Sequence, residues 1–271
     1  MAISFSLNTP LGIEMRRSFG VVAVSAFLFI SAPLFADPPD VKSAQNIGYN
    51  SETRPLDCSD ISNCNDWGAR AYKSGDYSAA ISYYTQQVAL ATQKEQGCAQ
   101  SNQADGQCTY PPQPFNNVAL ATLRDGHPLM ARAWINVAPP SALTQHNKML
   151  VEKVLTGFRW PRSPAGEYWS YAGYGVWNTL RVEPAGDRFD ISFEGYYFFA
   201  TGLDSGPDSG TLVDRVKIVQ GVAVLHGGDS SDCKITAEFK DDHVDLDTKG
   251  NDCPFGANVS AEGRYIRVSA P

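Results

Sequence analysis

The sequence is poor in the residues and motifs that enzymes and metalloproteins usually carry. It has four histidines, too few for a histidine-rich metal site, and no H-E-x-x-H, G-x-S-x-G or C-x-x-C motif. Its net charge of −7 argues against the basic surface that phosphate binding needs, so nucleic acid is not an expected partner. Hydrophobic residues make up 43% of the chain, which suits an ordinary globular core and excludes disorder throughout.

The first 36 residues predict a signal peptide. Two arginines at positions 16 and 17 precede an apolar run over residues 19–29, and small residues lead to Ala36. This order of regions is typical of an export signal, so we expect cleavage after Ala36 and a periplasmic or secreted protein. A membrane anchor is the alternative, but the run is shorter than the roughly 20 residues that a span needs. The leader begins at Met1 or, with a more usual length, at Met15. No later stretch is apolar enough to span.

The six cysteines all follow the leader and lie in three local couples. In an oxidising compartment such couples predict disulfides, although six cysteines allow many connectivities. Zinc binding is the alternative, and the lack of histidine near the first four cysteines disfavours it. The candidate disulfide residues are Cys58, Cys64, Cys98, Cys108, Cys233 and Cys253.

Charge and composition divide the rest of the chain into two parts. Residues 37–162 carry 11 basic and 11 acidic residues, whereas residues 163–271 carry 9 basic and 17 acidic residues. A proline- and glycine-containing segment between them is typical of a linker. We expect an α+β protein with a disulfide-tied N-terminal extension (37–65), a helical domain (66–159), a linker (160–166) and an acidic β domain (167–271).

Residues 66–92 predict a helical hairpin, because apolar residues recur at helical spacing on both sides of a break at Ser74-Gly75-Asp76. The segment resembles a tetratricopeptide repeat. The resemblance rests on Gly68, Tyr72, Gly75, Asp76, Tyr77, Ala80 and Tyr84. It departs from the family pattern at Ala71, where the family has an aromatic residue, and at Thr92, where it has proline. The resemblance implies stacked helical hairpins that bind peptides or proteins and catalyse no reaction.

A second copy of the hairpin is expected at residues 116–137, with Gly126 in the turn and Ala131 and Ile135 in the second helix. The turn glycines are 51 residues apart, against about 34 in a simple array, and the excess is an insert at 96–114. Two repeats are fewer than the usual minimum of about three, so the helices should lean on another part of the chain or another copy. A closing helix is expected at 141–155, with these residues facing inward: Leu143, Met149, Leu150, Val154 and Leu155.

The C-terminal part predicts an antiparallel β domain, either a sandwich or a small barrel. Residues 187–199 alternate clearly between apolar and polar side chains, as a one-sided strand does. Further strands are expected at 213–219, 222–226, 234–239, 243–246 and 263–268.

Three motifs in this part point toward chemistry without completing it. Ser231 to Lys234 fits S-x-x-K, but the companion motifs are absent. Residues 242–249 are similar to the D-x-x-D-x-D-x-E run of chitinases, but Lys249 stands where the proton-donating acid belongs. Residues 245–250, at the end of this run, resemble the start of a calcium-binding loop, but no glutamate closes the loop. Calcium is a further option at two loops that carry Asp204, Asp208, Asp229 and Asp232, although such turns need no metal. We therefore expect no enzyme and no required cofactor.

Five aromatic residues cluster at the start of the β domain: Tyr168, Trp169, Tyr171, Tyr174 and Trp177. Exposed, they would stack on sugar rings or form a hot spot for a protein partner. Buried, they would fill the β core or a domain interface, which is the reading we favour.

Three functions are compatible with these features. The first is an exported, non-catalytic adaptor or scaffold that binds protein through its repeats. The second is an inhibitor or immunity protein whose acidic β domain captures a cationic cell-wall lytic enzyme such as lysozyme, because charge complementarity speeds capture. The third is a peptidoglycan- or glycan-binding protein that uses the aromatic cluster.

Overall fold

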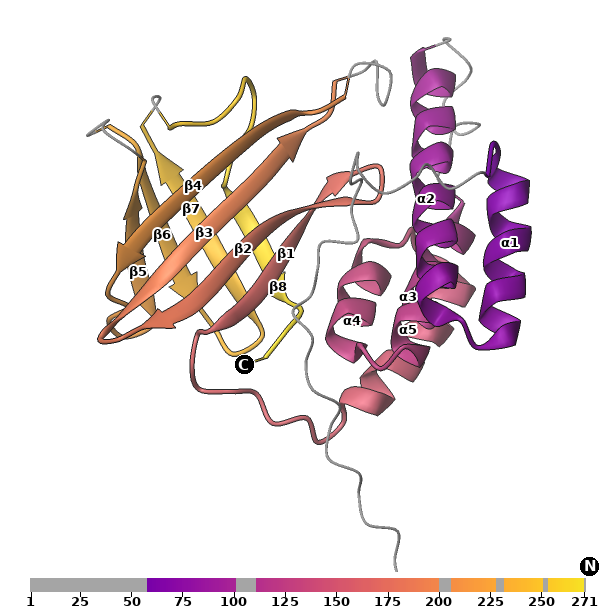
Figure 1. Cartoon of the computed structure of the whole chain (residues 1–271), viewed down its shortest axis with the longest axis horizontal. Coiled ribbons are helices and arrows are strands. Elements are labelled where there is room, and N and C mark those ends of the chain that lie inside the picture. Colours follow the sequence, from indigo (N-terminus) through magenta and orange to yellow (C-terminus); the bar gives the residue numbers. More distant parts are fainter. Residues whose placement is uncertain (1–57, 101–110, 200–205, 228–231, 251–252, 271) are drawn as a thin grey trace, which may run out of the picture. The chain divides into compact units, whose positions relative to one another are not determined.

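Residues 58–100, 111–199, 206–227, 232–250 and 253–270 are described by a computed structural model (Figure 1). In this part of the chain five helices precede eight strands, so the fold class is α+β, as the sequence predicts. None of the described helices is long and apolar enough to cross a membrane. The helices are α1 (Ile61–Ser74), α2 (Tyr77–Gln100), α3 (Pro112–Arg124), α4 (Pro128–Val137) and α5 (Ala142–Leu155).

The helix ends follow from the local sequence. Asp60 caps α1, where its carboxylate accepts the backbone N–H of Asn63 at 2.9 Å. The helix stops at Gly75, whose φ of 84° is a conformation that glycine adopts without strain. Asp76 then accepts the N–H of Ala79 at 3.0 Å and starts α2. Both α3 and α4 carry a proline in the first turn, where no intrahelical N–H bond is lost.

Each helix packs against the next one along the chain, and α3 also packs against α5. Helices α1 and α2 approach closely at Gly68, where a Cβ would lie only 2.5 Å from a ring carbon of Tyr84. Gly126 adopts a φ of 87° in the turn between α3 and α4. The remaining residues on which the repeat resemblance rests are buried or half-buried in these hairpins: Tyr72, Tyr77, Ala80, Ala131 and Ile135.

Amide side chains connect α1, α3 and α5. Asn116 of α3 accepts from Asn147 of α5 at 2.8 Å and donates to the hydroxyl of Thr144 at 2.9 Å. Asn117 of α3 donates to Asn65 of α1 at 3.2 Å. Buried amides must be hydrogen-bonded, so these contacts set how the three helices face one another.

The expected orientation of α5 is wrong. The face of α5 that is buried carries Thr144, Asn147 and Val151. The amide of Asn116 explains this rotation, because an unpaired buried amide costs about 1–3 kcal/mol, and Thr144 and Asn147 satisfy it. Of the residues expected to face inward, Leu155 alone packs against the core, whereas Leu143, Met149, Leu150 and Val154 are exposed.

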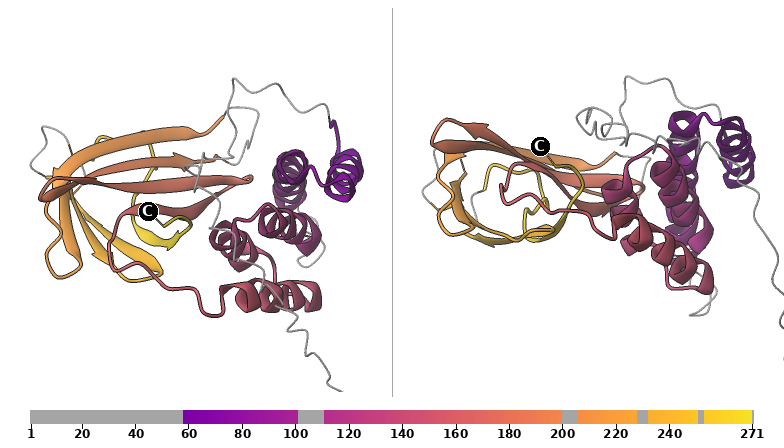
Figure 2. Two further views of the ribbon diagram at one scale, coloured as in Figure 1. Left: turned by 60° about the horizontal axis from the view of Figure 1, so that its bottom comes forward. Right: turned by 90° about the horizontal axis from the view of Figure 1, so that it is seen from below.

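The strands form one antiparallel sheet that curls into a nearly closed barrel (Figure 2). Its order is β4-β3-β2-β1-β8-β7-β6-β5, so β4 and β5 are the two edges. A tight turn bridged between Val219 and Val222 connects these edges. The carboxylate of Asp214 in β4 accepts the N–H of His226 in β5 at 2.9 Å. The strands are β1 (Gly166–Gly173), β2 (Val176–Ala185), β3 (Arg188–Tyr197), β4 (Asp208–Val216), β5 (Val222–His226), β6 (Lys234–Phe239), β7 (His243–Lys249) and β8 (Gly263–Arg267).

Side chains fill the barrel interior. Tyr168 of β1, Phe193 of β3 and Tyr265 of β8 are buried there among aliphatic residues from β2 to β7. Small barrels are commonly packed in this way and then hold no ligand inside. The strands expected at 222–226 and 234–239 have the predicted bounds, whereas the sequence reasoning assigned no strand to residues 166–185, which form β1 and β2.

The helices and the barrel share one hydrophobic core. Trp169 of β1, Trp177 of β2 and Val268 after β8 belong to the same buried cluster as Trp134 of α4 and Val88 of α2. The helices therefore bury part of their apolar surface against the sheet.

Two of the expected disulfides are confirmed. Cys58 pairs with Cys64, with Cα atoms 5.0 Å apart, and Cys233 pairs with Cys253, with Cα atoms 4.7 Å apart. Cys98 is also disulfide-bonded, and Cys108 lies outside the described residues. No cysteine in the described part is free, so zinc has no thiol to bind there.

Candidate functional site

An aromatic cluster joins the helices to the barrel. Trp177 of β2 stacks on Trp169 of β1 with ring centroids 5.2 Å apart, and it meets Trp134 of α4 edge-on at 5.0 Å. Tyr171 of β1 lies 5.0 Å from Trp177 and 6.0 Å from Phe115 of α3. These rings form the interface between the two halves of the fold.

The five aromatic residues singled out in the sequence lie in or beside this interface. Successive residues of a strand point to opposite faces, so Tyr168 enters the barrel interior while Trp169 faces the helices. Tyr174, in the turn before β2, donates its hydroxyl to Gln96 of α2. Tyr168, Trp169, Tyr174 and Trp177 are all buried, so none of these four rings offers an open face to a sugar.

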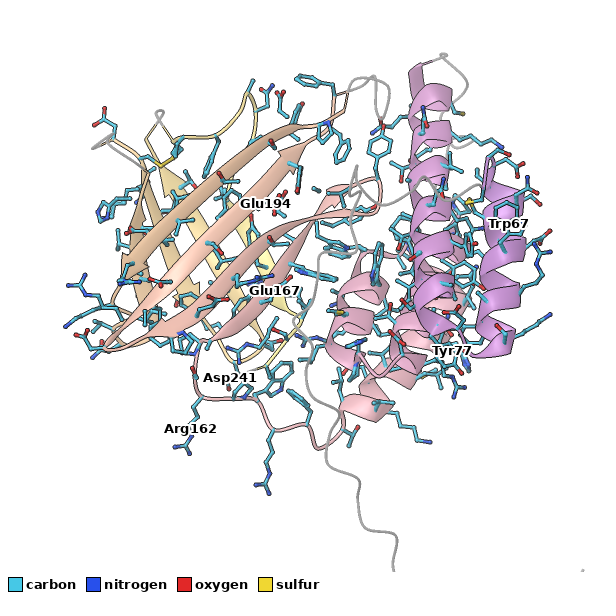
Figure 3. All side chains as sticks on the ribbon, in the orientation of Figure 1. Trp67, Tyr77, Arg162, Glu167, Glu194 and Asp241 are labelled. Carbon is cyan, nitrogen blue, oxygen red and sulfur yellow. A yellow bond between two sulfur atoms is a disulfide. The ribbon has the colours of Figure 1, made fainter. Side chains whose placement is uncertain are left out.

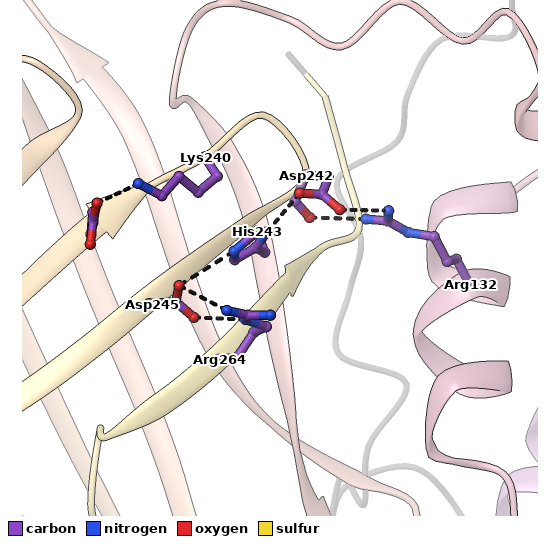
Figure 4. A network of polar contacts seen from close by, with 7 residues as sticks. Arg132, Lys240, Asp242, His243, Asp245 and Arg264 are labelled. Carbon is purple, nitrogen blue, oxygen red and sulfur yellow. Dashed lines mark hydrogen bonds and ion pairs between the residues drawn. The ribbon is translucent and has the colours of Figure 1, made fainter.

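A polar network makes a second link between the helices and the barrel (Figure 4). Arg132 of α4 contacts Asp242 twice, at 3.1 Å to the carboxylate and at 2.9 Å to the carbonyl. Asp242 lies 2.6 Å from Nδ1 of His243, whose Nε2 lies 3.4 Å from Asp245. Asp245 in turn accepts two hydrogen bonds from Arg264, at 2.7 and 3.1 Å.

The charges in this network stabilise one another. Burial acts to raise the pKa of Asp242, but the hydrogen bond from His243 and the charge of Arg132 outweigh it and hold that pKa below its usual value. The hydrogen bonds from Arg264 lower the pKa of Asp245. Each ring nitrogen of His243 faces a carboxylate, so neither is free to activate a nucleophile. The arrangement suits a structural link better than catalysis.

Arg267 of β8 holds the segment that connects α5 to β1. Its buried guanidinium donates to the carbonyls of Ser163 at 2.7 Å and Pro161 at 3.3 Å, and it lies over the ring of Tyr168 at 5.0 Å. The segment expected to be a linker is therefore hydrogen-bonded to the barrel. Next to it, Glu167 of β1 accepts the indole N–H of Trp169 at 2.7 Å, and burial raises the pKa of this carboxyl (Figure 3).

Two clefts open on the surface of the barrel. One, of about 320 Å³, lies beside the segment after α5 and is lined by Phe189, Ile218 and Phe239 among others. The other, of about 550 Å³, follows the seam between β4 and β5. Arg162 borders the first cleft and extends away from the ribbon in Figure 3. Neither cleft combines a histidine with a serine, threonine or cysteine nucleophile.

The other motifs from the sequence do not gather into a site among the described residues. Lys249 is exposed and lies 3.6 Å from Asp247. Ser231 and two of the four calcium candidates, Asp204 and Asp229, lie outside the described residues. Within the described ranges, no three His, Cys, Asp or Glu side chains are placed to hold a metal ion.

Exposed apolar side chains concentrate on α5. Nine large hydrophobic residues are exposed in the described part of the chain, and four of them belong to this 14-residue helix. Leu143, Leu150 and Val154 are 43%, 39% and 56% exposed. Their spacing places them within about 40° of one another around the helix axis. We call these three residues the α5 stripe; Met149 points to a different side.

No protein-family model matches the chain, and comparison with curated proteins and with solved structures also finds no match.

Proposed function

We propose that this protein is exported and acts as a non-catalytic adaptor that binds another protein through its helices. The α5 stripe is the observation that carries the proposal. Contiguous apolar side chains on a protein surface commonly mark an interaction site. Here they lie on the last helix before the chain enters the barrel, and α5 packs only a narrow, partly polar face against α3 and α4.

The resemblance to tetratricopeptide repeats supports the same function, because that family binds partners with stacked helical hairpins. The turn at Gly75 and Asp76 and the close approach of Gly68 to Tyr84 agree with the hairpin that the resemblance implies. Export is supported by the leader pattern and by the disulfides, which persist mainly in oxidising compartments.

The test begins with the full chain, expressed with a C-terminal tag and recovered from the periplasm. Mass spectrometry of the product should give an N-terminus at Asp37. The tagged protein is then used to capture partners from periplasmic extract at low and at moderate salt.

The specific readout is a comparison of three proteins in this capture: the unmodified chain, Leu150→Asp and Val213→Asp. Val213 of β4 is 75% exposed, so its variant is a matched control for placing a charge at an exposed apolar position. We expect a stoichiometric partner that Leu150→Asp loses and Val213→Asp keeps. A robust hydrolase activity in the purified protein, or no stoichiometric partner for any of the three, would contradict the adaptor function.

A further inference from the structure

We infer that the α5 stripe receives an amphipathic helix of another protein, with carboxylates along the flank of its apolar face. This inference rests on the adaptor function. It specifies the secondary structure and the charge of the segment that the adaptor binds.

The form of the partner follows from what α5 offers. The backbone groups in the middle of a helix are already hydrogen-bonded within it, so α5 presents side chains and no open strand edge. Leu143, Leu150 and Val154 follow one another at intervals of seven and four residues along about 16 Å of helix. This is the spacing that matches the apolar face of a second helix lying along the first. An extended peptide would instead need unpaired backbone groups.

The area of the stripe argues against a second copy of this chain as the occupant. Three partly exposed side chains offer on the order of a few hundred Å², whereas a stable dimer buries about 800 Å² on each partner. A single amphipathic helix instead presents one narrow apolar face, which matches the width of the stripe.

The charge of the partner follows from the residues beside the stripe. His146 and Lys153 are exposed on one flank of it, within about 60° of Leu150. Glu152, the acidic residue of α5, lies about 180° away from the centre of the stripe. Lys153 forms no ion pair with any residue in the described ranges, whereas Arg215, Lys217 and other barrel cations lie within 4.0 Å of carboxylates. The cation beside the stripe is therefore available to a carboxylate on a partner.

The test uses two synthetic peptides of about 18 residues that differ in charge alone. The first has leucines along one helical face and glutamates on both flanks; the second replaces every glutamate by lysine. Each peptide carries a fluorophore and is titrated with the full exported chain while fluorescence anisotropy is recorded. We expect the glutamate peptide to bind with a Kd in the micromolar range and the lysine peptide to bind at least about tenfold more weakly.

Variants then locate the binding on α5. Leu150→Asp should weaken binding of the glutamate peptide at least about tenfold, whereas the matched control Val213→Asp should leave the Kd unchanged. Lys153→Glu should shift the preference toward the lysine peptide. A thermal melt confirms that each variant is folded. All three positions are exposed, so none of the changes should prevent folding.

Two results of the peptide titrations would overturn the inference: no saturable binding of the glutamate peptide, or equal binding of both peptides. In sedimentation, a dimer of the unmodified chain that Leu150→Asp abolishes would identify a second copy as the occupant instead. Binding to anionic phospholipid vesicles, in place of the peptide, that depends on Leu150 would identify a membrane surface. The two proposals fail in different ways. If extract yields a stoichiometric partner that all variants keep, the adaptor function stands and the α5 site falls. If no variant captures a partner, the adaptor function itself falls.

Discussion

Replacing Trp177 by alanine should weaken the helices and the barrel together. Trp177 is 2% exposed and lies 5.0–5.2 Å from the rings of Trp169, Trp134 and Tyr171. A buried aromatic side chain covers roughly 150–250 Å², and at about 25 cal/mol per Å² its loss removes about 4–6 kcal/mol before relaxation. Partial collapse of the cavity brings the expected loss to about 3–5 kcal/mol. The indole N–H of Trp177 has no hydrogen-bond partner among the described residues. The expected loss of stability therefore comes from packing and not from a lost hydrogen bond.

The assay is urea unfolding of the unmodified chain, Trp177→Ala and Trp67→Ala, followed by far-UV circular dichroism and by hydrogen exchange of peptides from α4 and β2. Trp67 of α1 is half-buried and contacts Tyr83 away from the barrel, so its loss should cost about 1 kcal/mol. In Trp177→Ala, protection of α4 and β2 should fall together, because they share one core. The reasoning is refuted if Trp177→Ala costs less than about 1 kcal/mol, or if β2 loses protection while α4 keeps it.

Three further outcomes are expected. Gly68→Ala should destabilise the helices by about 1–3 kcal/mol, because the new Cβ meets the ring of Tyr84. The control Gly97→Ala, in open space on α2, should be neutral or stabilise the protein by up to about 1 kcal/mol. Equal urea midpoints for the two variants would contradict the close packing at Gly68. The pKa of Asp242 is lowered in the folded protein, so the carboxylate adds to the free energy of unfolding above pH 3.8, and this stabilisation is lost as the pH falls through the lowered pKa. Asp242→Asn should therefore flatten the acid limb of the curve of stability against pH. An unchanged acid limb would rule this out. Burial raises the pKa of Tyr171 from 10.0 to about 12, so the unfolded chain ionises first and stability should fall between these pH values; Tyr171→Phe should reduce that fall, and full phenolate absorbance of the folded protein near pH 10 would contradict it.

Much of the fold is readable in the sequence wherever a local pattern decides the structure. Gly75 and Asp76 mark the turn between α1 and α2 because one relieves backbone strain and the other caps a helix. Alternation in residues 187–199 predicts a strand, which the structure places at β3, because one face of that strand is buried. The proximity of Cys58 to Cys64 and of Cys233 to Cys253 was enough to favour their pairing.

Strand β2 was missed although buried Leu180 and Val182 alternate with exposed Arg181 and Glu183. Strand β1 escaped prediction because both of its faces are covered. Tyr168 faces the barrel core while Trp169 faces the helices, so the segment shows no alternation of apolar and polar residues. The aromatic richness of residues 168–177 was the available signal, and it indicated burial without indicating a strand.

The structural links Arg132–Asp242 and Arg267–Ser163 also carry no local signal. Each joins residues more than 100 positions apart, and an arginine in a strand or helix is usually exposed. The burial of these two side chains becomes evident only when their distant partners are placed beside them.

The sequence by itself indicated several elements: the turn between α1 and α2, strands β5 and β6, two of the disulfide pairs, and the order of helices before an antiparallel sheet. Capping, glycine turns and side-chain periodicity act over a few residues, so they are set before any long-range contact forms. Only the tertiary structure decided which faces are covered. The leucines of α5 have the periodicity of a core face, yet α5 turns Thr144 and Asn147 inward, where both hydrogen-bond the buried amide of Asn116. Leu143, Leu150 and Val154 are consequently left in water.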